Sequence, residues 1–128
     1  MVNTKSPKVF VIQTEENFKK LRKGAYVYEA PLAILVCAEQ NDAWRRPFDG
    51  KYMAEIDASI TTAYMMLQAI ELELSTAWIC HFNAEIIKYE FGLPDDLEPV
   101  NILTIGYASS EQEVFNSYLE SCITDAVF

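Results

Sequence analysis

The chain has 128 residues, of which 51% are hydrophobic and 23% are charged, with a formal net charge of −9. Residues 1–51 hold nine Lys or Arg against six Asp or Glu, a net of +3, and residues 52–128 hold one Lys against thirteen acids, a net of −12. We expect one globular domain, 1–128, because no linker, repeat or low-complexity tract divides it. An acidic chain repels phosphate backbones, so nucleic acid is an improbable partner.

The N-terminus and the cysteines indicate a soluble cytoplasmic protein. "MVNTKSPK" lacks the hydrophobic stretch of a secretory signal, and no apolar run approaches the roughly 20 residues that span a bilayer, so we expect no membrane partner. Cys37, Cys80 and Cys122 are far apart, and the chain has one histidine, so a metal site is not expected.

Two strands and a helix are predicted in the first 39 residues. "KVFVIQ" (8–13) is β-branched and apolar, which favours a strand. Thr14 can cap a following helix that Gly24 closes. "PLAILVCAE" (31–39) is apolar on both faces, which suits a central buried strand.

Residues 40–53 are predicted to form a surface loop. Pro47 and Asp49-Gly50 supply turn chemistry, and Trp44 stands between charged residues. A loop of this length that carries an aromatic residue can act as a lid, and the alternative is an ordinary connection with Trp44 packed down.

The strongest helical pattern covers residues 54–74. It contains one continuous apolar stripe, formed by Ile56, Ile60, Ala63, Leu67, Ile70 and Leu74. A second apolar set on another face comprises Ala58, Met65, Ala69 and Leu72. A helix that is apolar around much of its girth is buried on several sides, so we predict that this helix lies in a homodimer interface.

The remaining pattern predicts a strand at 75–82, a helix capped by Asn83 and stopped at Gly92, and a buried strand at 99–108. The tail from 109 onward has mixed character. The element order is therefore β-α-β-α-β-α-β followed by a tail, which predicts a layered α/β or α+β domain.

The stretch "STAWICHFN" (75–83) concentrates an indole, a thiol and the only histidine of the chain. As a strand it would place Trp78, Cys80 and Phe82 on one face and His81 on the other, so a Cys-His nucleophile is not favoured. One interpretation is a core strand. The other is that a planar redox cofactor lies against the strand end and is held by backbone N–H groups.

Several blocks of the sequence resemble the FMN-dependent nitroreductase family. They are the segment 44–51 with its Asp-Gly-Lys, "IDASI" (56–60), "MML.A" (65–69), "L.T.WIC.F" (74–82), "FGLP" (91–94) and "EPV.IL.IGYA" (98–108). Upstream, "NTKSPKVFVI" (3–12) resembles the family's Asn-containing segment before its first strand. The blocks occur in the family's order and together cover most of the chain.

The resemblance implies an α+β, three-layer fold with a mostly antiparallel sheet wrapped by helices, in an intertwined homodimer. It implies FMN at the subunit interface and NAD(P)H as the transient reductant of nitroaromatic, quinone or similar small-molecule acceptors. Cofactor contacts are implied for Trp78, Ile79, Cys80 and His81 at the ring, Asn3 and Lys5 upstream, and Trp44 and Arg45 in a covering loop. The resemblance assigns no catalytic side chain.

The sequence departs from the family pattern at the cofactor phosphate. The family's N-terminal Arg-rich helical segment does not match any part of this chain, and residues 89–128 contain no Lys or Arg. A phosphate without a cation is costly to bury. We therefore expect either an N-terminally shortened flavin oxidoreductase or a truncated, non-catalytic dimeric relative with weak or no flavin binding.

Overall fold

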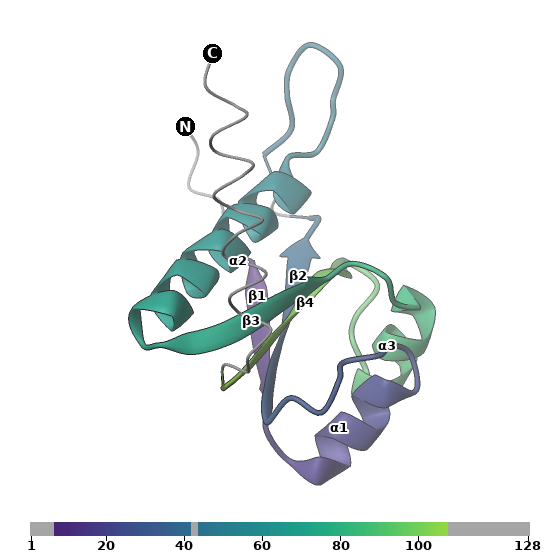
Figure 1. The fold of residues 1–128 in the computed structure, drawn as a ribbon. Coiled ribbons are helices and arrows are strands. Elements are labelled where there is room, and N and C mark those ends of the chain that lie inside the picture. Colours follow the sequence, from purple (N-terminus) through teal and green to yellow (C-terminus); the bar gives the residue numbers. More distant parts are fainter. Residues whose placement is uncertain (1–6, 42–43, 108–128) are drawn as a thin grey trace.

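The computed structural model describes residues 7–41 and 44–107. They form a four-stranded sheet and three helices (Figure 1). In chain order the elements are β1 (Lys8–Ile12), α1 (Glu15–Arg22), β2 (Leu32–Glu39), α2 (Ala54–Glu71), β3 (Leu74–Ile79), α3 (Ala84–Phe91) and β4 (Leu97–Tyr107).

Local capping fixes the ends of the two short helices. Thr14 Oγ1 accepts a hydrogen bond from Asn17 N at 3.2 Å at the start of α1, and Asn83 Oδ1 accepts one from Ile86 N at 3.2 Å at the start of α3. Gly92 ends α3 with φ +62°, in the left-handed region that glycine adopts without a Cβ penalty. The cap residues predicted for both helices are confirmed.

The sheet has the order β1-β2-β4-β3, and every neighbouring pair is antiparallel. β2 and β4 are therefore the central strands, which accounts for the apolar character of both of their faces. A register shift between Val36 and Cys37 marks a bulge in the β2–β4 pairing. The antiparallel α+β architecture expected from the resemblance is confirmed.

Helices cover both faces of the sheet, which gives three layers (Figure 1). The larger core lies between the sheet and the layer of α1 and α3, and it includes Ile12, Phe18, Leu35, Ile87 and Ile102. The smaller core lies under α2, where Ala54 and Ala58 pack on β2. Small alanine side chains let α2 approach the sheet closely. The sheet therefore buries only a small part of the apolar surface of α2.

The two apolar faces of α2 have different environments. Ala58 and Ala69 are buried and Met65 is half-buried, whereas Leu72 is exposed. The helix was predicted to reach Leu74, and this is wrong: α2 ends at Glu71, Glu73 adopts φ +61°, and Leu74 begins β3. The rest of the predicted stripe points away from the sheet: Ile56, Ile60, Leu67 and Ile70 are each about half exposed or more, at 54%, 49%, 62% and 56%. Sequence periodicity identifies both faces, and burial within this one chain accounts for only one of them. None of the described helices is long and apolar enough to cross a membrane.

Residues 44–53 form a hairpin that we call the arm, and it extends beyond the N-terminal end of α2 (Figure 1). Arg45 bridges to Tyr52, Arg46 N donates to Lys51 O at 2.9 Å, and Met53 N donates to Trp44 O at 3.1 Å. Phe48 at its tip is 99% exposed. The predicted surface loop is therefore an ordered hairpin that holds an aromatic side chain in solvent.

Candidate functional site

One end of the sheet brings the predicted site segments together. The start of β1 pairs with the end of β2, the end of β2 pairs with the start of β4, and Ile79 at the end of β3 pairs with Ile102 in β4. The chain leaves β2 at this same end, forms the arm and enters α2. The segments around Trp44 and around His81 therefore flank a common end of the sheet, although 37 positions separate these two residues in the sequence.

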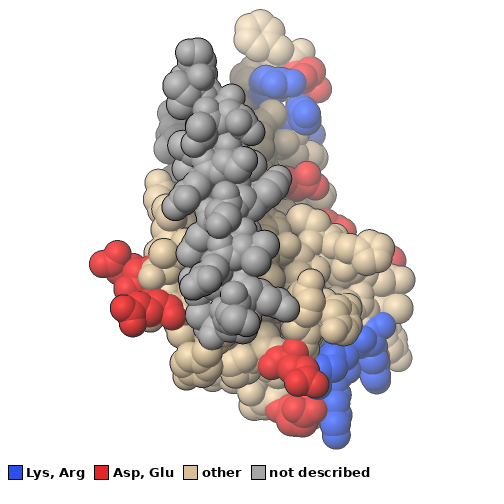
Figure 2. Space-filling model, viewed as in Figure 1, with Lys and Arg blue, Asp and Glu red and all other residues tan. Residues whose placement is uncertain are grey.

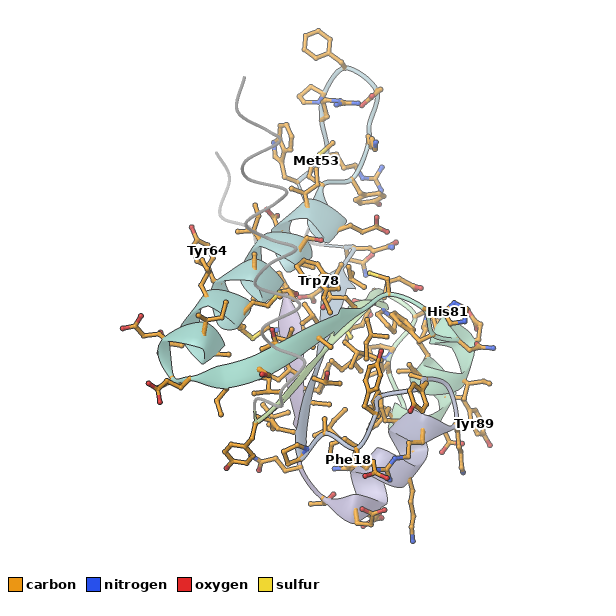
Figure 3. All side chains as sticks on the ribbon, in the orientation of Figure 1. Phe18, Met53, Tyr64, Trp78, His81 and Tyr89 are labelled. Carbon is orange, nitrogen blue, oxygen red and sulfur yellow. The ribbon has the colours of Figure 1, made fainter. Side chains whose placement is uncertain are left out.

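β3 ends at Ile79, before the thiol and the imidazole. Cys80 and His81 are both exposed, and Trp78 is 37% exposed. Figure 3 labels Trp78 and His81 among the side chains. Among the hydrogen bonds of the described residues, none has Cys80 N or His81 N as its donor. Within residues 7–41 and 44–107, two consecutive backbone N–H groups at the strand end thus have no acceptor, which is the feature that a ring cofactor held by main-chain amides requires.

The strand was predicted to continue to Phe82, and this is wrong. Trp78 pairs with Leu103 and lies on the α2 face of the sheet, whereas Phe82 packs with the core under α1 and α3. The reason is the turn at Cys80 and His81, which breaks the alternation of a strand. Phe82 is consequently an anchor of the turn, and it does not share a face with Trp78.

A second segment holds this turn in place. Phe82 forms an isolated bridge with Ala25, and Asn83 N donates to Gly24 O at 2.7 Å. A Cβ at Gly24 would lie 3.1 Å from Asn83 O and 3.0 Å from Ile87 Cγ1, so the close approach requires glycine. Sequence reasoning identified Gly24 only as a helix stop, because its contact with residue 83 is long-range.

A shallow groove runs beside the turn, between residues 24–26 on one side and residues 81–85 on the other. Tyr26 borders it and packs edge to face on Tyr28, with ring centroids 4.9 Å apart. The groove gives an aromatic border to the side of the turn that faces α1 and α3. Exposed rings next to available N–H groups suit a planar, partly polar ligand.

Two lysines near this end of the sheet are already paired with acids. Lys8 Nζ lies 3.9 Å from Glu39 Oε2, and Lys88 Nζ lies 3.3 Å from Glu98 Oε2. The hydrogen bond to Glu98 raises the pKa of the Lys88 ammonium. These two lysines neutralise local carboxylates, so they offer little positive charge for a phosphate.

The two cysteines of the described residues differ in environment. Cys37 is fully buried in the central strand, and burial, followed by the charge of Glu98, raises the pKa of its thiol from 9.0 to about 12. Cys80 is exposed at the candidate site. Cys37 therefore packs as a small apolar side chain in the buried strand predicted at 31–39, and thiol chemistry is confined to Cys80 in this part of the chain.

The other predicted contacts lie elsewhere or outside the described residues. Trp44 and Arg45 belong to the base of the arm, where the Arg45 guanidinium stacks over the Tyr52 ring at 4.0 Å. Their covering of a pocket stays a prediction. Asn3 and Lys5 lie outside the described residues.

Comparison with known proteins identifies the family. The model of the nitroreductase family matches residues 2–107, and the chain belongs to this family. A nitroreductase family protein from Clostridium difficile 630 is 54% identical, with a TM-score of 0.82, over 84% of this chain and 63% of that one. An FMN-dependent nitroreductase from Clostridium difficile R20291 is 26% identical, with a TM-score of 0.68, over 83% of this chain and 65% of that one.

A third solved structure shows the same fold at lower identity. It is a putative NADH oxidase from Clostridium acetobutylicum, 23% identical, with a TM-score of 0.65, over 84% of this chain and 67% of that one. The chain thus spans less than two thirds of the length of the first two relatives. No curated protein matched the chain.

Proposed function

We propose that this protein is an FMN-dependent oxidoreductase that uses NAD(P)H to reduce nitroaromatic, quinone or similar small acceptors. The observation that carries the proposal is the end of β3, where two exposed residues present backbone N–H groups without a donor bond among the described residues. The family and the name of the FMN-dependent relative at 26% identity support the choice of cofactor.

The residues at this strand end fit the ring of a flavin. The N–H groups of Cys80 and His81 can donate to acceptor atoms on the ring edge, and the exposed indole of Trp78 can border a planar surface. Bound FMN supplies the two-electron chemistry. The protein's own contribution is to hold and orient the ring: the bridge between Ala25 and Phe82 fixes the turn from which both N–H groups project.

Positive charge is the observation that favours the alternative. Residues 89–128 contain no Lys or Arg, and the lysines near the strand end are paired with acids. A dianionic phosphate needs compensating donors when it is removed from water. A non-catalytic dimeric relative with weak flavin binding is therefore the second candidate.

A ligand titration separates the two candidates. Binding to the folded state alone raises stability by RT ln(1 + [L]/Kd), about 2.7 kcal/mol at a hundredfold excess over Kd. We expect the melting temperature to rise with FMN, and the FMN-loaded protein to oxidise NADH or NADPH when a nitroaromatic or a quinone is present. Absence of any thermal shift at millimolar FMN rejects the oxidoreductase, and a shift without turnover supports the alternative. Riboflavin in parallel measures what the phosphate contributes.

Backbone donation is tested by removing one N–H group. Proline has no N–H, so His81→Pro should weaken FMN binding, whereas His81→Ala should leave the affinity nearly unchanged. Ala84→Pro is the matched control, because Ala84 is the first residue of α3, a position where proline is tolerated. If His81→Ala weakens FMN binding as much as His81→Pro does, the imidazole and not the amide holds the ligand.

We further propose that the protein is a homodimer through α2. The exposed stripe of Ile56, Ile60, Leu67 and Ile70 is a continuous apolar surface of the kind that marks an interface. Leu67→Asp should shift the chain toward monomer in sedimentation without loss of helical signal. Tyr89→Asp is the control, since Tyr89 is 84% exposed on α3 and lies outside the stripe. A wild-type chain that sediments as a monomer at every concentration rejects the dimer.

A further inference from the structure

The arm and the far end of α2 carry opposite charges. Figure 2 shows blue side chains over the arm at the top and a red acidic patch at the left, over the C-terminal end of α2. In the arm, Arg46 pairs with Asp49 through two hydrogen bonds, whereas Arg45 and Lys51 form no ion pair with any residue in 7–41 or 44–107. At the other end, Glu71 is the last residue of α2, and Glu73 follows it.

The carboxylates at the C-terminal end of α2 have no cationic partner within the described residues. The last turn of α2 contains no basic residue, and neither Glu71 nor Glu73 forms an ion pair with any described residue. A helix C-terminus carries partial negative charge, so carboxylates there are destabilising. Glu55 and Asp57, by contrast, lie in the first turn, where the helix itself favours them.

The arm is a closed hairpin with an exposed aromatic side chain at its tip. Backbone bonds and the Arg46–Asp49 pair close the hairpin, and Gly50 adopts φ +70° so that its N–H reaches Arg46 O at 2.7 Å. Phe48 is almost fully exposed at the tip, and Leu72, beside the acids at the far end of α2, is 60% exposed. The arm and the far end of α2 are therefore complementary in charge, and each also carries an exposed apolar side chain.

We propose that the arm of one chain docks on the α2–β3 turn, residues 71–73, of a second copy. The proposal rests on the dimer proposed above. α2 has 18 residues and is about 27 Å long at 1.5 Å per residue, and Ala63 lies midway along the stripe. When two such helices pack antiparallel and cross at this small residue, the N-terminal end of each lies beside the C-terminal end of the other.

Charge selects the antiparallel arrangement. A parallel pairing would bring the two cationic arms together and the two acidic turns together. The antiparallel pairing instead places Lys51 and Arg45 near Glu71 and Glu73 of the second copy, and the tip of the arm near its Leu72. Because a two-fold dimer contains the contact twice, each favourable pair counts twice in the dimer affinity.

A reciprocal charge exchange tests this contact. We expect Lys51→Glu alone and Glu71→Lys alone each to raise the dimer Kd about tenfold at low salt, and the double variant to return it to within about threefold of wild type. Lys19→Glu makes the same charge change on an exposed residue of α1, and it should leave the dimer Kd unchanged. Sedimentation of the full chain without FMN gives the dimer Kd of wild type and of all four variants.

The single variant Glu71→Lys also separates docking from folding. Lysine suits a helix C-terminus, so this substitution should stabilise α2 while it weakens the dimer. Additive losses in the double variant, or no change in the single variants, overturn the docking of the arm. If Leu67→Asp still dissociates the dimer in that case, the α2 interface stands and only the contact of the arm is wrong. Flavin binding, measured separately, decides the proposed function.

Discussion

At the scale of single residues, one buried polar contact joins α2 to the sheet. Thr62 Oγ1 lies 3.0 Å from Ala58 O and 3.0 Å from Asn101 Oδ1, and both side chains are fully buried. Asn101 Nδ2 has no partner among the described residues. Thr62→Val would leave the whole amide without a side-chain partner, so we expect a loss of about 1–3 kcal/mol of unfolding free energy in denaturant titration.

Thr61→Val is the matched control for this loss. The Thr61 hydroxyl also donates to a backbone carbonyl four residues earlier, at 3.1 Å, but it is only partly buried and touches no amide across the interface. Its replacement should cost under about 0.5 kcal/mol. Thr62→Val with Asn101→Leu should recover much of the single loss, and a double variant as unstable as the sum of both changes would contradict the pairing.

The two cysteine environments predict different alkylation. Iodoacetamide at pH 8 should label Cys80 in the folded protein, and Cys37 only after unfolding, as read by peptide mass spectrometry. Between pH 9 and about 12 the folded chain keeps the Cys37 proton that the unfolded chain releases. The contribution of this thiol to stability is therefore complete below pH 9 and is lost as the pH rises through that window. Labelling of Cys37 at the same rate as Cys80 would contradict its burial.

At the scale of elements, the sequence predicted the order and type of every described helix and strand. Apolar period and cap residues carry this information locally, as at Thr14, Asn83 and Gly92. The length of β3 was not predictable, because the turn at Cys80 depends on bonds to Gly24, far away in the sequence. The sequence pattern also did not predict that the arm is a hairpin. The stack of Arg45 on Tyr52, which joins its two sides, is a side-chain contact that turn residues do not indicate.

For the candidate site, the sequence indicated the position of the segment around His81, and the cofactor contacts stay a prediction. The resemblance placed "WIC" and His81 at a strand end, and the structure describes them there, with Ile79 half-buried against the core and Trp78, Cys80 and His81 exposed. Which partners support that strand end is a property of the tertiary contacts, so the sequence pattern alone did not indicate the groove bordered by Tyr26. Periodicity marked both apolar faces of α2 but did not distinguish the face that the sheet covers.

The helix caps yield a prediction that separates stability from binding. Asn83→Ala and Thr14→Ala each remove one side-chain bond to a backbone N–H at a helix start, and each should cost about 1 kcal/mol. Only Asn83 is also part of the turn after His81. We therefore expect FMN affinity, measured by fluorescence titration, to fall in Asn83→Ala and to stay unchanged in Thr14→Ala. Equal affinities in the two variants would mean that α3 does not position the ligand.

At the scale of the whole molecule, the proposed dimer and the proposed flavin site sit on connected elements. α2 begins at the end of the sheet where β3 finishes, and it packs on β2, β3 and β4. A second copy bound along α2 would constrain the helix that flanks the site. The effect of dimerisation on FMN affinity and the effect of FMN on dimer affinity are reciprocal, because both belong to one thermodynamic cycle.

This coupling predicts an effect of FMN on assembly. If pairing through α2 raises FMN affinity by some factor, saturating FMN must lower the dimer Kd by the square of that factor. The square arises because a two-fold dimer binds two molecules of FMN. Sedimentation with and without FMN gives one side of the cycle, and FMN titrations of wild type and of Leu67→Asp give the other. An FMN affinity that is the same for dimer and monomer, together with a dimer Kd that FMN does not change, would show that each chain holds its ligand alone.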